Sequence, residues 1–183
     1  MVDLAFLQSI SYMAGAIGVC IAAIYYVLIV RLNQRTMRIT LTNNLIQRLL
    51  TEEFTAQVTE LIYMEWKDYD DYERKYGSDN NPEIFNKRST VWGVFDSLGI
   101  LLLKGLADKD ILYNCQAVFA SAFLWSKYRS VLEENRRRYI GKDGYIGLEY
   151  LGREMLRTKQ IRDPEYKIPE SNWRYIPANE ASQ

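Results

Sequence analysis

The stretch LAFLQSISYMAGAIGVCIAAIYYVLIVRLNQRTMR, residues 4–38, carries no charged side chain before Arg31 and turns basic from there on. A helix rises about 1.5 Å per residue, so one over residues 4–30 reaches roughly 40 Å, more than the ~30 Å hydrocarbon core of a bilayer requires. A secretory signal peptide starts with basic residues and has a shorter apolar region, whereas this chain starts with MVD. The stretch therefore predicts a transmembrane helix, residues 4–30, that is retained in the mature protein.

The charges that flank this stretch predict its orientation. Asp3 precedes the apolar residues, while Arg31, Arg35 and Arg38 follow them. Basic residues collect on the cytoplasmic side of a span, where they also meet the lipid headgroups. We therefore expect a single-pass protein of the cell membrane, in contact with membrane lipid, whose C-terminal domain is cytoplasmic.

Small residues recur every four positions inside the predicted span. Ala14, Gly18 and Ala22 form a stripe on one helix face, with Gly15 beside it. Small side chains let two helices approach closely in lipid, so the stripe predicts contact with another membrane protein or with a second copy of the chain. The alternative is that the stripe has no such role, since glycine is common in membrane-spanning helices.

Composition restricts the chemistry of the chain. The 183 residues have a formal net charge of zero, which argues against a dedicated nucleic-acid-binding protein. Histidine is absent and the two cysteines are Cys20 and Cys115, so neither a Cys/His zinc site nor a Ser-His or Cys-His nucleophile pair can be assembled. The sequence also lacks a Gly-rich phosphate loop, a dinucleotide fingerprint and a GxSxG elbow. We therefore expect no catalytic residue, no cofactor and no metal ligand.

Helical periodicity extends beyond the span, and strand-like alternation of useful length is absent. Leucines at four-residue spacing predict a juxtamembrane continuation of the helix over residues 31–50. Residues 51–160 contain apolar faces for about four helices joined by short connections, which predicts an all-α, antiparallel bundle. The first of these helices is expected to run from Thr51 to about Tyr76. The most apolar helix, which contains LGILLLKGL, is expected at the centre of the bundle.

The final residues, 161–183, have a different character. Several prolines prevent a long helix there, yet the aromatic content is too high for an inert tail. We expect an extended segment that packs on the bundle or on a partner, with Trp173 and Tyr175 as contact residues.

An acidic-aromatic motif, WKDYDDYERKYGSDNNPE, covers residues 66–83. Its carboxylates Asp68, Asp71 and Glu73 are suited to acid–base chemistry if they line a cleft. The alternative is an amphipathic helix with its tyrosines inward and its carboxylates outward, which the spacing favours.

Three consecutive arginines, Arg136, Arg137 and Arg138, stand at the end of a predicted helix. They are candidate contacts for a partner, for phosphate or for lipid headgroups. Position gives a simpler interpretation, because cations stabilise helix C-termini and can also face an acidic neighbouring helix.

The chain resembles a family of uncharacterised prokaryotic, largely archaeal, proteins with an N-terminal single-pass anchor and a helical cytoplasmic domain. The resemblance rests on GAIGVCIAAIYYVLIVR, WKDYDDYERKYGSDNNPE, FDSLGILLLKGL and FLWSKYRSVLEENRRRY, and it covers most of residues 10–157. No activity is established for that family, so the resemblance implies a fold and a location but no site.

We consider two functional hypotheses. The first is a non-enzymatic, membrane-tethered interaction module or a small accessory subunit of a membrane protein complex. The second is a membrane-bound enzyme or ligand-binding helical bundle that uses carboxylate, tyrosine and arginine side chains. A deep pocket with Asp68, Asp71 or Glu73 beside Arg136 favours the second hypothesis, and a solid core with these carboxylates on the surface favours the first.

Overall fold

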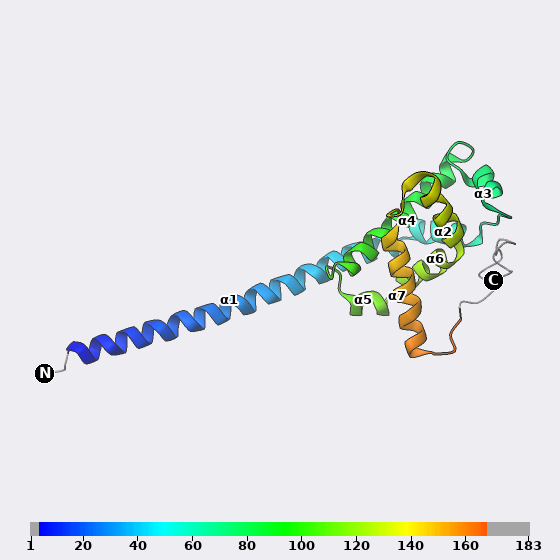
Figure 1. Cartoon of the computed structure of the whole chain (residues 1–183). Coiled ribbons are helices and arrows are strands. Elements are labelled where there is room, and N and C mark those ends of the chain that lie inside the picture. Colours follow the sequence, from blue (N-terminus) through cyan, green and yellow to red (C-terminus); the bar gives the residue numbers. More distant parts are fainter. Residues whose placement is uncertain (1–3, 168–183) are drawn as a thin grey trace. The chain divides into compact units, whose positions relative to one another are not determined.

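The computed structural model describes residues 4–167, which are all-α as predicted (Figure 1). These residues form seven α-helices and one π-helical turn, and no strand occurs among them. The elements are α1 Leu4–Leu49, α2 Glu52–Tyr63, α3 Tyr69–Tyr76, α4 Pro82–Leu103, α5 Lys109–Asn114, α6 Gln116–Asn135, the π-helical turn η1 Arg136–Ile140, and α7 Ile146–Arg162.

The chain divides into two compact units, residues 1–40 and residues 41–183. α1 is unbroken across this boundary and remains helical through residues 31–49. The first unit is therefore the N-terminal part of α1. The second unit, which we call the helical domain, begins with the last turns of α1 and contains all the other helices.

The last turns of α1 pack into the helical domain. Ile46 and Leu49 are buried in its hydrophobic core. Thr42 is completely buried, and its hydroxyl oxygen accepts a hydrogen bond from the Asp108 N–H at 2.8 Å. Because the Asp108 side chain is itself the N-cap of α5, this bond connects the end of α1 to the start of α5.

The helix expected from Thr51 to about Tyr76 is interrupted, so this prediction is wrong. The chain is extended at Met64, and a new helix, α3, begins after Asp68, whose side chain is its N-cap. Trp66 lies in the break and is completely buried. The apolar periodicity continues across the break and therefore predicts one helix. The break depends instead on Asp68, because an aspartate side chain can bond backbone N–H groups and begin a new helix.

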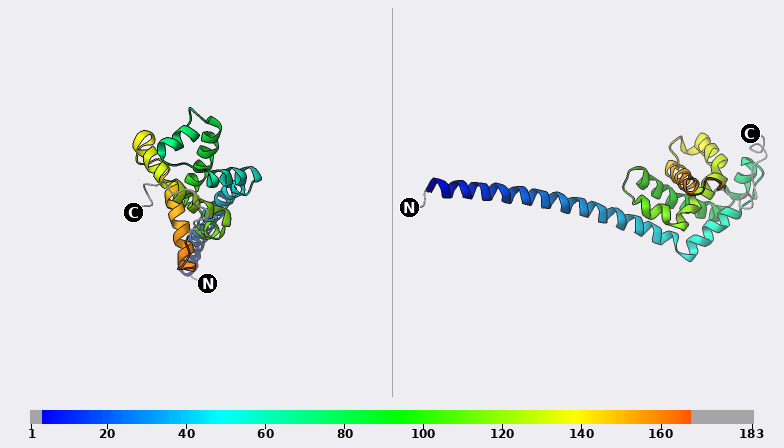
Figure 2. Two further views of the ribbon diagram at one scale, coloured as in Figure 1. Left: turned by 90° about the vertical axis from the view of Figure 1, so that its right-hand side faces the viewer. Right: turned by 90° about the horizontal axis from the view of Figure 1, so that it is seen from below.

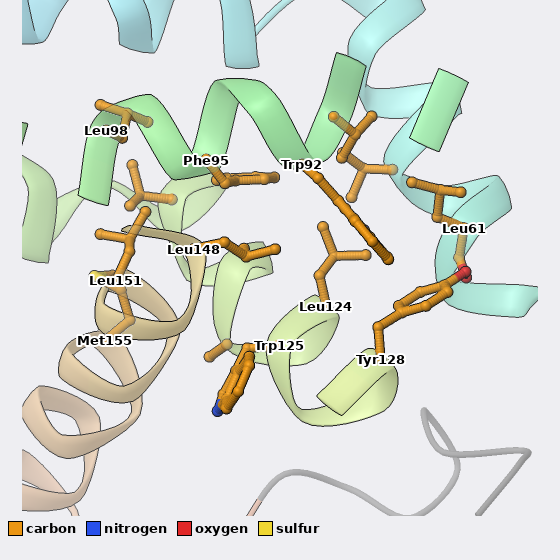
Figure 3. Close-up of a cluster of buried hydrophobic side chains, with 14 of the residues drawn as sticks. Leu61, Trp92, Phe95, Leu98, Leu124, Trp125, Tyr128, Leu148, Leu151 and Met155 are labelled. Carbon is orange, nitrogen blue, oxygen red and sulfur yellow. The ribbon is translucent and has the colours of Figure 1, made fainter. Parts of the chain in front are cut away.

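In the helical domain, α7 packs against both α4 and α6 (Figure 2). The core lies between these three helices (Figure 3). Figure 3 shows Trp92 and Phe95 pointing from α4 toward Leu124 of α6 and Leu148 of α7. All four side chains are at most 1 % exposed. The most apolar helix, α4, also contacts α2 and α3, which agrees with its expected central place.

α4 and α7 approach each other at a pair of glycines. A Cβ atom added to Gly99 would lie 1.8 Å from the carbonyl oxygen of Gly147, so neither position accepts a side chain without movement of the backbone. Beside this crossing, the Asp96 carboxylate accepts hydrogen bonds from the N–H groups of Gly147 and Leu148, at 2.8 and 3.1 Å. Asp96 of α4 thus caps the N-terminus of α7, although the two residues are far apart in sequence.

The C-terminal segment is described as far as residue 167. α7 ends at Arg162, and the ring of Tyr166 packs edge-to-face against Phe119 of α6, with 5.8 Å between ring centroids. This part of the segment therefore lies on its own domain. Trp173 and Tyr175, the predicted contact residues, lie outside the described residues.

Candidate functional site

The first candidate surface is the apolar part of α1. Four of its aliphatic side chains, Ile17, Val19, Ile21 and Ile24, are each 60–70 % exposed. Within the described residues, α1 is the one helix that is long and apolar enough to cross a membrane. A continuous exposed apolar surface marks a region that contacts lipid or another protein.

The small-residue stripe and the basic flank lie on this helix as expected. Ala14, Gly15, Gly18 and Ala22 are exposed, and a Cβ added to either glycine would meet no atom within 4 Å. Arg31, Arg35 and Arg38 are also exposed. The space beside the stripe is available to a second helix, and the interface itself stays a prediction.

Two carboxylates of the acidic-aromatic motif, Asp68 and Asp71, stabilise the start of α3. Asp68 accepts a hydrogen bond from the Asp71 N–H at 2.8 Å, and Asp71 accepts one from the Lys67 N–H at 3.0 Å. The arrangement resembles a capping box, except that the second bond comes from Lys67, the residue before the N-cap. Asp71 is buried and also pairs with Arg74 and Lys75, so the expectation that the carboxylates point outward is wrong for this residue.

The surroundings of Asp71 favour its charged form. The Lys75 ammonium and the Lys67 amide hold the pKa of the Asp71 carboxyl well below its usual range. A carboxylate that is ionised and bonded on several sides is a poor general acid or base at neutral pH. Within the described part of the chain, no group of three or more Cys, Asp and Glu side chains is arranged to hold a metal ion.

Arg136 connects the π-helical turn to α7. Its guanidinium pairs with Glu149 at 2.7 Å and donates hydrogen bonds to the carbonyl oxygens of Gly144, at 2.7 Å, and Tyr145, at 3.3 Å. These contacts fix the connection between η1 and α7. Arg136 therefore has a structural role and does not lie beside Asp68, Asp71 or Glu73 in a shared pocket.

Arg137 and Arg138 both pair with Glu134, one helical turn earlier. Hydrogen bonds from the two guanidinium groups, reinforced by their charges, lower the pKa of Glu134 from its usual 4.5 to about 2. Arg138 also lies over the ring of Tyr69, 4.4 Å from its centroid, and 3.7 Å from an oxygen of Asp70. The expected pairing of this cluster with the acidic helix is thus present for Arg138, while contacts with a partner remain a prediction.

The least expected residue of the domain is Arg88 of α4, a cation that is 4 % exposed. Its guanidinium carbon lies 4.9–5.1 Å from the ring centroids of Tyr72, Phe85 and Trp92. One nitrogen, Nη1, donates to the Tyr72 hydroxyl and, at 3.5 Å, to the Tyr76 carbonyl. Burial lowers the pKa of Arg88 below its usual value.

Arg88 lines a cavity of about 290 Å³, which we call the Arg88 pocket. The pocket lies between the end of α3, the first half of α4 and the connection from α6 to α7. Its other lining residues are Glu73, Ser78, Asp79, Phe85, Ser89, Asn135, Tyr139, Ile140 and Tyr145. Of the predicted carboxylate set, Glu73 lines this pocket, and its cationic neighbour there is Arg88 rather than Arg136.

Two features of the backbone adjoin this pocket. Tyr139 and Ile140 belong to η1, a π-helical turn, which is a rare element that is frequent at functional sites. Tyr145 has φ 54° and ψ 36°, in the left-handed region that side chains other than glycine rarely adopt. Such strained residues cluster at ligand-binding sites, although they also occur in turns.

Sequence reasoning did not single out Arg88, and one signal was available. Arg88 lies four residues after Ile84 and four before Trp92, so it stands on the apolar face of its helix. Lys127 has the same property within α6 and is also 4 % exposed. A long cation on an apolar face usually extends its charged end to water, and neither side chain does so here.

Comparison with known proteins places this architecture in a family without assigning it a function. A family model described as "Domain of unknown function (DUF4760)" matches residues 13–155, which include most of α1 and most of the helical domain. No curated protein and no solved structure matches the chain. The match agrees with the resemblance to an uncharacterised family.

Proposed function

The chain belongs to the DUF4760 family, whose function is unknown, and from that premise we propose that it is a single-pass, membrane-tethered interaction module. In this proposal α1 anchors the protein, the helical domain lies in the cytoplasm, and the whole acts as a small, non-enzymatic accessory subunit of a membrane protein complex.

The observation that carries this proposal is the exposed apolar surface of α1. Removing one Val, Leu or Ile side chain from water is worth about 1.5–3 kcal/mol, and the helix exposes such side chains on every face between Ile10 and Leu28. A bilayer provides the apolar surroundings that the helical domain does not. The backbone hydrogen bonds of the helix are satisfied internally, as the hydrocarbon core of a membrane demands.

The orientation is supported by the arginines that follow the apolar stretch. Arg31, Arg35 and Arg38 lie on its C-terminal side and are exposed. By the positive-inside rule this side, and with it the helical domain, is cytoplasmic.

The non-enzymatic role is supported by how the domain uses its charged groups. Asp68 caps α3, and Asp71 pairs with two cations of the same helix. Arg136, Arg137 and Arg138 pair with glutamates of the same domain. The small-residue stripe is the part of the molecule that fits an interaction within the membrane.

The stripe provides the test of association. We expect the full-length protein, extracted in mild detergent and crosslinked, to form a defined complex with itself or with another membrane protein. Gly18→Leu should weaken the complex because it fills the stripe, whereas Ala16→Leu, on the opposite helix face, should not. A strictly monomeric protein under several extraction conditions contradicts the proposal.

Topology is tested separately with a protease applied to intact cells. We expect the helical domain to survive until the cells are lysed. Digestion beyond Leu50 without lysis would show that the domain is outside, and the cytoplasmic assignment would then be wrong.

A further inference from the structure

We propose that the Arg88 pocket binds a small zwitterionic molecule of amino-acid type, with the ligand carboxylate on the guanidinium of Arg88. This site lies within the helical domain and is independent of the proposed membrane tether. The inference goes beyond the interaction role of the protein, and the two proposals can fail separately.

The first argument is the incomplete pairing of a buried cation. A buried charge is costly unless it is paired, and Arg remains protonated in proteins. Nevertheless, no carboxylate among the described residues lies within 4.0 Å of Arg88, and its stabilising neighbours are three aromatic rings. Neutral rings offset part of the lost hydration but do not supply a counter-ion.

The second argument is geometric. All hydrogen bonds that Arg88 makes with described residues come from Nη1, to Tyr72 and Tyr76, so Nε and Nη2 have no such partner there. Adjacent donors on one edge of a guanidinium match the two oxygens of a carboxylate. Arg88 lines the pocket, and the proposal places the ligand carboxylate there on this edge of the guanidinium.

The walls of the pocket indicate the rest of the ligand. Phe85, Tyr139 and Ile140 provide apolar surface. Glu73 and Asp79 add two carboxylates, which repel a dianion such as phosphate and attract an ammonium group. The volume of about 290 Å³ lies at the small end of ligand pockets, which span roughly 300–1,000 Å³. One anchoring cation, an acidic wall and a small apolar volume together fit a free amino acid.

The strained connection at Tyr145 supports the same assignment. Tyr145 is held by the Arg136 guanidinium, which binds its carbonyl at 3.3 Å, and by edge-to-face contact with Trp92, 5.3 Å between ring centroids. A left-handed backbone is unfavourable for a tyrosine, so these two contacts hold this wall of the pocket in a conformation that the residue alone would not adopt.

The test uses full-length protein in detergent and measures binding of each protein amino acid by calorimetry and ligand-observed NMR. We expect at least one amino acid to bind at millimolar concentration or below. Its analogue without the carboxylate should not bind, and its analogue without the amine should bind more weakly. If no amino acid binds, or if inorganic phosphate binds more tightly than every amino acid, the proposal is wrong.

Variants then assign the binding to the pocket. Arg88→Met should weaken binding about ten- to hundredfold, as expected for the loss of a charged hydrogen bond, while Arg157→Met, at an exposed pair, should leave it unchanged. Tyr139→Ala is the second variant, because Tyr139 is 67 % exposed and its loss does not disturb the core. Unchanged affinity in both pocket variants would place the binding elsewhere and overturn the proposal.

Two further variants refine the ligand class. Glu73→Gln should weaken binding of the amino acid but not of its amine-free analogue. Equal effects on both would show that Glu73 does not contact a ligand ammonium.

The chain's own C-terminal segment contains Glu170 and Glu180, whose carboxylates could bind Arg88 as a ligand carboxylate does. The double variant Glu170→Gln, Glu180→Gln should leave binding unchanged. A manyfold gain would show that this segment occupies the pocket, and a free ligand would then be the wrong assignment.

Discussion

The two ends of α1 contain similar apolar residues in opposite surroundings. Between Ile10 and Leu28 the side chains are exposed, whereas Ile46 and Leu49 are buried in the helical domain. The same contrast holds for glycine, since a Cβ on Gly18 would meet open space and one on Gly99 would meet the backbone of α7. Residue type alone does not determine burial. The helical domain buries much of its apolar surface in its own core, whereas the apolar side chains of α1 between Ile10 and Leu28 are exposed.

We expect the largest effect from substitutions that place charged residues in the exposed part of α1. Each arginine at the centre of a membrane span costs about 2.5–3.5 kcal/mol on insertion scales. Gly18→Arg combined with Ile21→Arg should therefore move the protein out of the membrane fraction without changing the unfolding of the helical domain. Membrane fractionation and urea unfolding measure the two outcomes.

The matched control places the same charges on the exposed surface of the domain. Leu103 and Ile161 are 49 % and 72 % exposed, so Leu103→Arg with Ile161→Arg should leave membrane association intact. If the α1 variant stays in the membrane through an alkaline wash, lipid does not surround this helix and the comparison loses its basis.

The reverse experiment removes volume from the buried side. Phe95 is completely buried, with its ring 5.8 Å from that of Phe54. Truncation of a buried Phe typically costs about 3–5 kcal/mol, so Phe95→Ala should lower the free energy of unfolding by that amount. Membrane association should be unchanged. A loss of less than about 1 kcal/mol would show that this core is looser than close-packed interiors allow.

The two glycines sharpen the contrast at the level of a single methyl group. Gly99→Ala forces a Cβ against the Gly147 carbonyl and should cost about 1–3 kcal/mol of unfolding free energy, as overpacking does. Gly18→Ala should leave the unfolding of the domain unchanged. Equal effects of the two substitutions would mean that the crossing of α4 and α7 is not as close as the structure has it.

The sequence predicted the helical class and the apolar N-terminal helix because both depend on local patterns. Helical periodicity and the length of an uncharged stretch are readable from consecutive residues. The break at Met64 was missed because a capping carboxylate, Asp68, can end one helix and start another without any change in apolar spacing. The close crossing of Gly99 and Gly147 was missed because its two halves lie in different helices.

The candidate pocket was less predictable for the same reason. Its lining comes from several separate segments, and no short motif joins Arg88 to Tyr139 or Tyr145. The one local signal in the sequence is the position of Arg88 on the apolar face of its helix, which marks it as unusual but does not reveal a pocket. Whether such a cation is paired, exposed or enclosed by rings depends on tertiary contacts that spacing does not encode.

The smallest expected effect concerns a buried charge. The exposed stretch of α1 contains no cation, whereas the domain buries Lys127, whose ammonium donates to the Ile62 carbonyl and lies 5.1 Å from the centroid of the Trp66 ring. Burial lowers the pKa of Lys127 from 10.5 to about 8, against a smaller opposing effect of Glu65.

The sign of the pH dependence follows from this pKa. Between pH 8 and 10.5 the unfolded chain keeps a proton on Lys127 that the folded chain has released, so the free energy of unfolding rises with pH. From about pH 7 to about pH 9.5 the gain should be about 1–2 kcal/mol. The raised pKa values of Tyr69 and Tyr128 act in the opposite direction, but above pH 10, where unfolded tyrosines ionise.

Lys127→Met should therefore remove this rise, while Lys104→Met, at an exposed position, should keep it. Urea unfolding at the two pH values measures the difference between the two slopes. The comparison of slopes is informative even if the methionine changes overall stability. A packing change alters the free energy of unfolding by the same amount at both pH values and leaves their difference unchanged. A rise that persists in Lys127→Met would show that another group releases the proton and that Lys127 reaches water. The ammonium of Lys127 would then be hydrated like that of an ordinary surface lysine.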